Sequence, residues 1–185
     1  INKATGRKFG KSEEGAIWLD EKKTSVFKFY QFWLNADDEG VVDYAKIFTL
    51  LDKAAIEVLE KAVRENPAGR EAQKTLAREV TTIVHGADRA ESAERVTAVL
   101  FGDKPVAELS DADIDLLSTE IATVSRGSSV VEALVQAGAA NSNGEARRLL
   151  GGGAISVDGQ KLAEDTVLQE RALIKKGKNS FILVQ

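Results

Sequence analysis

A basic loop near the start of the chain carries the residues best suited to chemistry. It reads Gly6-Arg7-Lys8-Phe9-Gly10-Lys11-Ser12. Lys8 and Lys11 stand on a glycine-bearing backbone with the Ser12 hydroxyl beside them. Together these donors can surround a nucleoside triphosphate, whose leaving pyrophosphate gains negative charge in the transition state. The loop therefore has the character of a mobile clamp for polyphosphate, and it is not a complete active site.

Two other interpretations of this loop are open. A P-loop places a strand before Gly-x-x-x-x-Gly-Lys-Ser/Thr, but here Thr5 occupies the position of the first glycine and no apolar strand precedes it. A P-loop nucleotidase is therefore the weaker alternative. A lysine-rich loop near a terminus can also be a solvated turn with no ligand.

A second cationic cluster lies on a helix expected near residue 145. Ser142 and Glu145 have the spacing of a capping box that starts this helix, which ends at the glycines 151–153. The apolar residues that follow face a core, which turns Arg147 and Arg148 outward. Backbone N–H groups at the helix start and two guanidinium groups form a phosphate cradle. The inward-facing residues of this helix are Ala146, Leu149 and Leu150.

Composition excludes several kinds of site. The chain has 185 residues, of which 43% are apolar, no cysteine and a single histidine, His85. A disulfide framework and a thiolate or imidazole metal site are therefore not expected, and no metal ligands are assigned. His85 is expected to be structural, at the end of a helix just before Gly86. No apolar run is long enough for a membrane span and no signal peptide is recognisable, so we expect a cytoplasmic protein without membrane contact.

Charge is distributed unevenly. The net charge is −4, yet residues 125–185 carry +2 and residues 1–124 carry −6. A basic tail on an acidic body favours a polyanionic partner. The chain begins at Ile1 and contains no methionine, so we expect a fragment whose amino-terminal part is absent.

The middle of the chain has helical periodicity from Thr24 for about a hundred residues. Phe29 and Trp33 lie one turn apart in the first helix and are expected to be buried. Pro67 suits the first turn of the fourth helix. The expected helices run from Ser25 to about Ala36, from Val41 to Leu51, from an N-cap at Asp52 to Asn66, from Pro67 with an inward stripe of Leu76, Val80, Ile83 and Val84, from Asp88 with Val96, Val99 and Leu100 inward, and from Ser110.

The sequence changes character after a linker at residues 125–128. Ser129–Gln136 is expected to be a short helix that stops at Gly138, and the helix at Ser142 follows. Asp158-Gly159 is a strong hairpin signal between strands at 154–157 and 160–162. A second hairpin is expected from residues 172–176 and 180–184 around Gly177-Lys178-Asn179.

The basic loop resembles the second signature of class I aminoacyl-tRNA synthetases, Lys-Met-Ser-Lys-Ser, in the form Lys-Phe-Gly-Lys-Ser/Thr of the bacterial tyrosyl enzymes. The resemblance extends over nearly the whole chain. It includes Trp18-Leu19-Asp20, the stretch from Phe29 to Asn35 with Asp37-Asp38, Gln73-Lys74-Thr75-Leu76-Ala77 and Val84-His85-Gly86. The chain is thus similar to the carboxyl-terminal part of bacterial tyrosyl-tRNA synthetases.

The resemblance implies roles for these segments. Lys8 and Lys11 would hold the β- and γ-phosphates of ATP while the tyrosine carboxylate attacks the α-phosphorus, and Ser12 would add a donor; ATP is a substrate, with magnesium expected. Asp37 or Asp38 would accept hydrogen bonds from an anticodon base. The partner would be tyrosine tRNA, bound by a homodimer formed through the absent catalytic domain. The chain alone should be an inactive part of a tyrosine–tRNA ligase.

The resemblance also implies a mainly α fold of three parts. Residues 1–23 would be the signature loop and the tail of the catalytic domain, residues 24–124 a helical-bundle anticodon-binding domain, and residues 125–185 a small α+β RNA-binding domain of the αL, ribosomal-protein type. The last domain would contact the long variable arm of the tRNA. Its expected RNA-binding residues are Arg126, Ser142, Asn143, Arg147, Arg148, Lys161, Lys175, Lys176 and Lys178. A free-standing RNA-binding protein without catalysis is the alternative.

Overall fold

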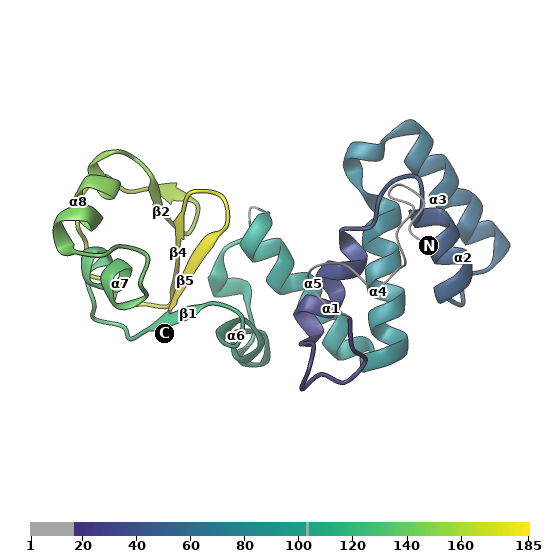
Figure 1. Ribbon diagram of the computed structural model, residues 1–185, viewed down its shortest axis with the longest axis horizontal. Helices are drawn as coiled ribbons and strands as arrows, with labels where there is room; N and C mark the ends of the chain where they lie inside the picture. The colour runs from purple at the N-terminus through teal and green to yellow at the C-terminus, as the bar shows by residue number, and fades with distance from the viewer. Residues whose placement is uncertain (1–16, 103) are drawn as a thin grey trace. The chain divides into compact units, whose positions relative to one another are not determined.

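The computed structural model describes residues 17–102 and 104–185 (Figure 1). The basic loop with Lys8, Lys11 and Ser12 lies outside these residues. The chain divides into two compact units after Glu94, a position inside helix α5 (Ala87–Phe101). Within the described ranges no helix combines the length and apolar character that crossing a membrane requires. The domain ranges expected from sequence remain a prediction.

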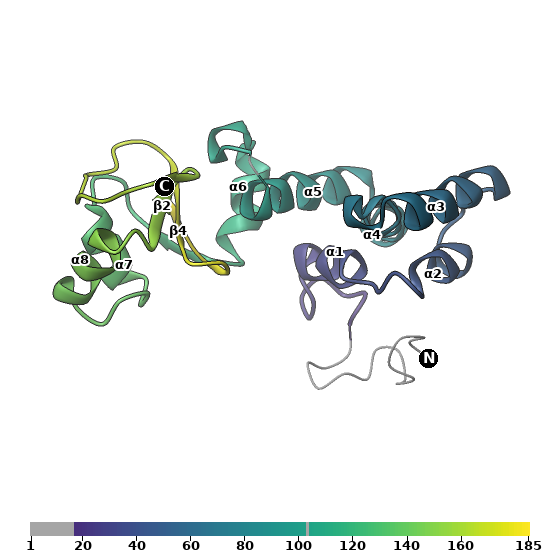
Figure 2. The same cartoon turned by 90° about the horizontal axis from the view of Figure 1, so that it is seen from above.

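The first unit is helical. Its elements besides the start of α5 are α1 (Val26–Leu34), α2 (Val41–Phe48), α3 (Lys53–Glu65), the 3-10 turn η1 (Pro67–Gly69) and α4 (Glu71–His85). Helix α4 packs on α1, α2 and α3, and Figure 2 gives a second view of these helices. The predicted helices of this unit are therefore confirmed, with ends that differ by at most four residues.

Local side chains explain where the helices of this unit begin. The Ser25 hydroxyl accepts from the Lys28 amide, and the Asp52 carboxylate accepts from the Ala55 amide at 2.8 Å, which confirms the predicted N-cap. The prediction for Pro67 was wrong in one respect. Pro67 starts the 3-10 turn, and Arg70 then adopts a left-handed conformation with φ 55° before α4 begins, so the chain turns between the two helical pieces.

The core of this unit is aromatic. Phe29 and Trp33 are buried, as predicted, with ring centroids 6.3 Å apart in an edge-to-face arrangement. Leu76 and Val80 of the predicted α4 stripe are buried, but Ile83 is 51% exposed, so the stripe does not extend to that position.

The second unit combines helices with a five-stranded mixed sheet. After the last part of α5 come the 3-10 turn η2 (Val106–Glu108), α6 (Asp111–Ser118), β1 (Ala122–Val124), α7 (Val130–Gln136), α8 (Asn143–Gly151), β2 (Ile155–Val157), β3 (Gln160–Lys161), β4 (Ala172–Lys176) and β5 (Ser180–Val184). The strand order is β1-β5-β4-β2-β3, with β1 parallel to β5 and the other pairs antiparallel. The coarse expectation of a mainly α chain with a small sheet is confirmed.

Both predicted hairpins are present. Asp158 and Gly159 have φ values of 47° and 81°, as a two-residue turn with both central residues left-handed requires. The second hairpin joins β4 and β5 through Gly177, with φ 62°. Strand β1 was not expected from the sequence, because its three residues pair with residues 60 positions later in the chain.

One face of the sheet packs against α7 and α8, which lie together on the same side of the strands in Figures 1 and 2. The core between them is aliphatic. It includes Val124, Leu134, Leu150, Ile155, Ile174, Ile182 and Val184.

The predicted helix starts at Ser110 and Ser129 are confirmed. Each serine forms a reciprocal capping box, Ser110 with Asp113 and Ser129 with Glu132. Val96, Val99 and Leu100 of α5 are buried as predicted.

Candidate nucleic-acid interface

Helix α8 presents two adjacent exposed arginines, Arg147 in its middle and Arg148 in its last turn. Ala146 and Leu150 are buried against the sheet core, so Arg147 and Arg148 face solvent, as predicted. Neither guanidinium forms an ion pair with another described residue. Two exposed guanidinium groups without a carboxylate partner can bind phosphate oxygens.

The start of α8 differs in detail from the predicted capping box. The Ser142 hydroxyl accepts from the Glu145 amide at 3.2 Å, but the Glu145 carboxylate does not return to Ser142. It accepts instead from the backbone amide and the side-chain amide of Asn141, at 2.8 and 2.9 Å. These two hydrogen bonds lower the pKa of Glu145, and the positive charges of Lys176 and Arg148 lower it further. The carboxylate thus ties the loop before α8 to the helix.

Lys175 and Lys176, adjacent in sequence, point to opposite faces of β4. Lys176 lies opposite Ile155 and Ser180, on the face covered by α7 and α8, and its ammonium donates to the Ala139 carbonyl between these helices. Lys175 lies opposite Ser156 and Phe181 on the other face. The two residues were predicted to act together in RNA binding, but the structure does not bring them together.

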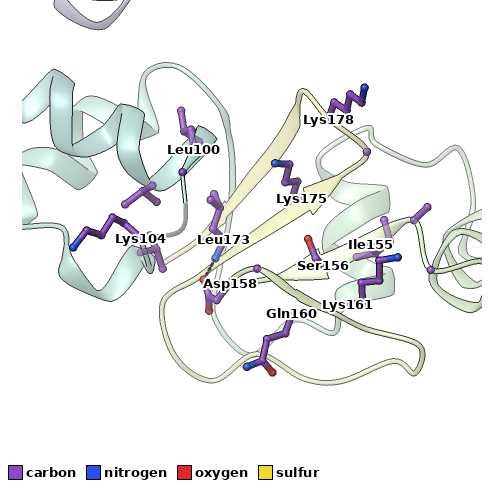
Figure 3. Close-up of a pocket in the computed structure, with 17 residues that line it drawn as sticks. Leu100, Lys104, Ile155, Ser156, Asp158, Gln160, Lys161, Leu173, Lys175 and Lys178 are labelled. Atoms are coloured by element: carbon purple, nitrogen blue, oxygen red, sulfur yellow. Dashed lines mark hydrogen bonds between the residues drawn. The ribbon is translucent and has the colours of Figure 1, made fainter. Parts of the chain in front are cut away.

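The second face of the sheet borders a groove of about 860 Å³ within this unit (Figure 3). Lys161, Lys175 and Lys178 line it, and Lys104 lies at its other side. The first three have no carboxylate partner among the described residues, whereas Lys104 pairs with Glu108 at 3.3 Å. Among the described residues of the lining, the acidic one is Asp158, which accepts from the Leu173 amide at 2.9 Å. The described part of the lining therefore carries a net positive charge.

The remaining predicted residues occupy separate places. Arg126 is exposed just after β1, and its backbone amide donates to the Gln185 carbonyl. Asn143 is exposed in the first turn of α8. The nine predicted RNA-binding residues thus lie on α8 and at its N-cap, along the groove, next to the loop between α7 and α8, and just after β1.

In the first unit, the predicted anticodon residues have partners within the protein. Asp37 accepts from the Gly40 amide at 2.6 Å, and Asp38 accepts from the buried side chain of Gln73. The first bond is local to the turn before α2, and the second ties that turn to α4.

His85 has a structural position at the end of α4, as expected. Its ring packs edge-on against Phe29, with centroids 4.9 Å apart, and burial lowers its pKa. Residues 17–102 and 104–185 contain no group of three or more His, Cys, Asp or Glu side chains that could hold a metal ion.

Sequence reasoning missed two groove residues, Ser156 and Gln160. A signal for them was present. A two-residue turn at Asp158-Gly159 fixes the cross-strand pairs Val157–Gln160 and Ser156–Lys161. Because side chains alternate between the two faces of a strand, Lys175 and Lys176 must also point to opposite sides of β4.

Comparison with known proteins places these features in a family. The family model of class I tRNA synthetases for tryptophan and tyrosine matches residues 1–102, and that of the tyrosine–tRNA ligase SYY-like C-terminal domain matches residues 108–184. Among curated proteins, the tyrosine–tRNA ligase of Geobacillus stearothermophilus is 43% identical and that of Staphylococcus saprophyticus 39% identical, each across the whole of this chain. The chain spans 46% of the length of each.

Among solved structures, a C-terminally truncated mitochondrial tyrosyl-tRNA synthetase of Aspergillus nidulans matches 45% of this chain and 23% of its own, at 36% identity and a TM-score of 0.43. The two family models together cover the chain almost from end to end. The chain accordingly belongs to the class I tRNA synthetases of the tryptophan and tyrosine type, and within them it corresponds to the carboxyl-terminal part of the bacterial tyrosyl-tRNA synthetases.

Proposed function

We propose that this chain is the tRNA-binding and catalytic-loop portion of an enzyme that activates tyrosine with ATP and transfers it to tyrosine tRNA. The observation that carries the proposal is the family match over both units together with the free cations of the second unit. A set of exposed, unpaired Arg and Lys side chains on one small domain is the electrostatic footprint expected of an RNA-binding module.

The second unit would act as an αL-type domain. Arg147 and Arg148, with the first-turn amides of α8, would contact phosphates of the long variable arm, and Ser142 and Asn143 would help to shape that helix start. Lys161, Lys175, Lys178 and Arg126 would extend the positive surface. Such contacts position structured RNA mainly through its backbone and shape. Lys176 would contribute by holding the loop between α7 and α8.

The helices of the first unit would form the anticodon-binding domain. Asp37 and Asp38 accept hydrogen bonds within the protein, and a carboxylate can accept from several donors, among which an anticodon base could be one. This assignment follows the family resemblance.

The ATP site would draw on Lys8, Lys11 and Ser12, which lie outside the described residues. In this proposal the two ammonium groups stabilise the charge that develops on the leaving pyrophosphate. ATP is a substrate, and magnesium would accompany its phosphates. The complete enzyme would act as a homodimer.

The test is a comparison of two transcripts in filter binding to the 185-residue chain. One is tyrosine tRNA and the other is the same tRNA without its long variable arm. We expect the truncated transcript to bind at least about tenfold more weakly at moderate salt, because the phosphate contacts of the second unit would be lost. Equal binding of both would contradict the proposed role of this unit.

A further inference from the structure

Four side chains form a continuous row across the groove face of the sheet. Lys161 lies opposite Ser156, Ser156 lies opposite Lys175, and Lys175 lies opposite Phe181. Because neighbouring strands are about 4.8 Å apart, the two lysines stand roughly 10 Å from each other with the serine between them. We refer to Lys161, Ser156, Lys175 and Phe181 as the cross-strand row.

Contacts within the unit hold the end of this row in place. The Lys175 ammonium lies 5.3 Å from the centre of the Phe181 ring, which keeps its stem along the sheet. Phe181 in turn meets Phe101 edge-on, with centroids 5.6 Å apart. The Lys175 ammonium therefore lies close to the sheet surface at the groove and does not extend away from the sheet.

The groove lining combines apolar and cationic side chains. Val99, Leu100, Val106 and Leu173 supply apolar groups, and Figure 3 shows Leu100 and Leu173 together with Lys104, Lys161, Lys175 and Lys178. The Ser156 hydroxyl and the Gln160 amide also line the groove, and neither side chain has a hydrogen-bond partner among the described residues. An amide that can donate and accept is suited to the edge of a nucleobase.

An unpaired nucleotide can contact the apolar groups, the amide and the lysines of the groove at the same time. Its base would cover apolar groups of the lining and meet the Gln160 amide, while the phosphates on either side would meet Lys161 and Lys175. A paired base within a helix could not do so, because its edge and faces are already occupied. A purely apolar ligand would leave the lysines and the serine without partners.

We propose that this groove binds an unpaired nucleotide of single-stranded RNA, on the opposite side of the sheet from α7 and α8, so that the second unit contacts RNA from two faces. The inference rests on the proposed RNA-binding function and adds a site of different chemistry to it. The α8 arginines contact a structured backbone, and the groove holds a base that has left its helix.

The experiment uses the 185-residue chain and a fluorescent oligouridylate of about six nucleotides, a length within the usual site size of a single-strand groove. In Lys161→Ala/Lys175→Ala we expect roughly tenfold weaker binding and a slope of log K against log salt that is smaller by about 1.4, for two lost phosphate contacts. Lys53→Ala/Lys61→Ala, on exposed positions of α3, removes the same charge elsewhere and should leave both quantities unchanged.

A second variant tests base insertion without a change of charge. Ser156→Trp fills the space between the two lysines, and aromatic residues are well tolerated in strands. It should weaken binding of the oligouridylate and leave binding of a short RNA duplex unchanged, with the thermal melt confirming that the fold is intact. Oligouridylate binding that survives in either groove variant overturns the inference.

The outcomes separate this inference from the proposed function. Arg147→Ala/Arg148→Ala should weaken binding of tyrosine tRNA and leave oligouridylate binding intact. If the arginine variant loses tRNA affinity while both groove variants bind the oligouridylate normally, the groove inference alone fails. If the arginine variant and the groove variants all bind tyrosine tRNA as the parent does, the proposed function of this unit fails as well.

Discussion

The Arg95 guanidinium donates two hydrogen bonds to the carboxylate of Asp113, at 2.9 and 3.0 Å, and joins the middle of α5 to the start of α6. The Asp113 carboxylate is completely buried and also accepts from the Ser110 amide, whereas the Arg95 side chain is 46% exposed. The same carboxylate therefore caps one helix and anchors another.

Removing the Arg95 side chain should destabilise the fold more than is usual for a half-exposed arginine. Arg95→Ala leaves a buried carboxylate without its counter-charge, so we expect a loss of about 2–3 kcal/mol in the free energy of unfolding. Urea unfolding followed by circular dichroism measures it. Arg78→Ala is the matched control, because Arg78 pairs with Glu94 at a more exposed site and should cost less than about 1 kcal/mol. Equal costs for the two variants would contradict the anchoring role of Asp113.

The signature lysines can be tested in a tyrosyl-tRNA synthetase that contains this segment. Lys11→Ala should lower tyrosine-dependent exchange between ATP and pyrophosphate by on the order of 100-fold, because the charge on the leaving pyrophosphate loses a fixed donor. Binding of tyrosine tRNA should be nearly unchanged. A variant with full exchange activity would remove Lys11 from the ATP site.

Arg147 is the sharpest single test on α8. Arg147→Ala should weaken binding of tyrosine tRNA and reduce the slope of log K against log salt by about one, since one phosphate contact is lost. Titrations at several salt concentrations give the slope. Arg147→Lys keeps the charge and should retain most of the slope, while an unchanged slope in the alanine variant would place Arg147 outside the interface.

Glu145 should make the start of α8 sensitive to acid. Its pKa in the folded protein lies below the ordinary value of 4.5, chiefly because of the two hydrogen bonds from Asn141. The stabilisation is thus present above about pH 4.5 and is lost as the pH falls through the lowered pKa. In Glu145→Gln the amide protons of α8 should lose this part of their pH dependence, as measured by hydrogen exchange. An identical acid profile in both proteins would contradict the assignment.

Tyr30 should titrate only in strong alkali. Burial in the helical core, with the nearby Glu94 charge, raises its pKa to about 12 from 10.0. Because the folded pKa exceeds the unfolded value, the associated stabilisation is present below pH 10 and disappears between pH 10 and 12. Ultraviolet absorbance of the phenolate should show one tyrosine fewer titrating in this window than in the urea-unfolded chain. In Tyr30→Phe this difference should vanish.

Local signals made most of the fold predictable from sequence. Asp52, Ser110, Ser129 and Ser142 each mark a helix start through a side chain that reaches an amide three residues away, and Asp158-Gly159 marks a turn that only left-handed residues allow. Each of these features depends on a few residues that are close together in the chain, so it can be predicted from one sequence alone.

The missed features depend on partners distant in the sequence. Ala122–Val124 forms a strand because β5 pairs with it, and Ile83 is exposed because the helices packed on α4 do not reach it. The candidate site was predictable at α8, where helical periodicity turns Arg147 and Arg148 outward. The site was not predicted correctly along β4, because the sequence analysis treated Lys175 and Lys176 as one cluster. Side chains alternate between the two faces of a strand, so these two lysines lie on opposite faces.

The parallel pairing of β1 with β5 constrains the order in which the sheet can fold during synthesis. The ribosome makes β1 well before β5, yet β5 lies between β1 and β4 and supplies the hydrogen bonds of both. The sheet therefore cannot close before β5 has left the exit tunnel, and until then α7 and α8 lack part of the apolar surface on which they pack.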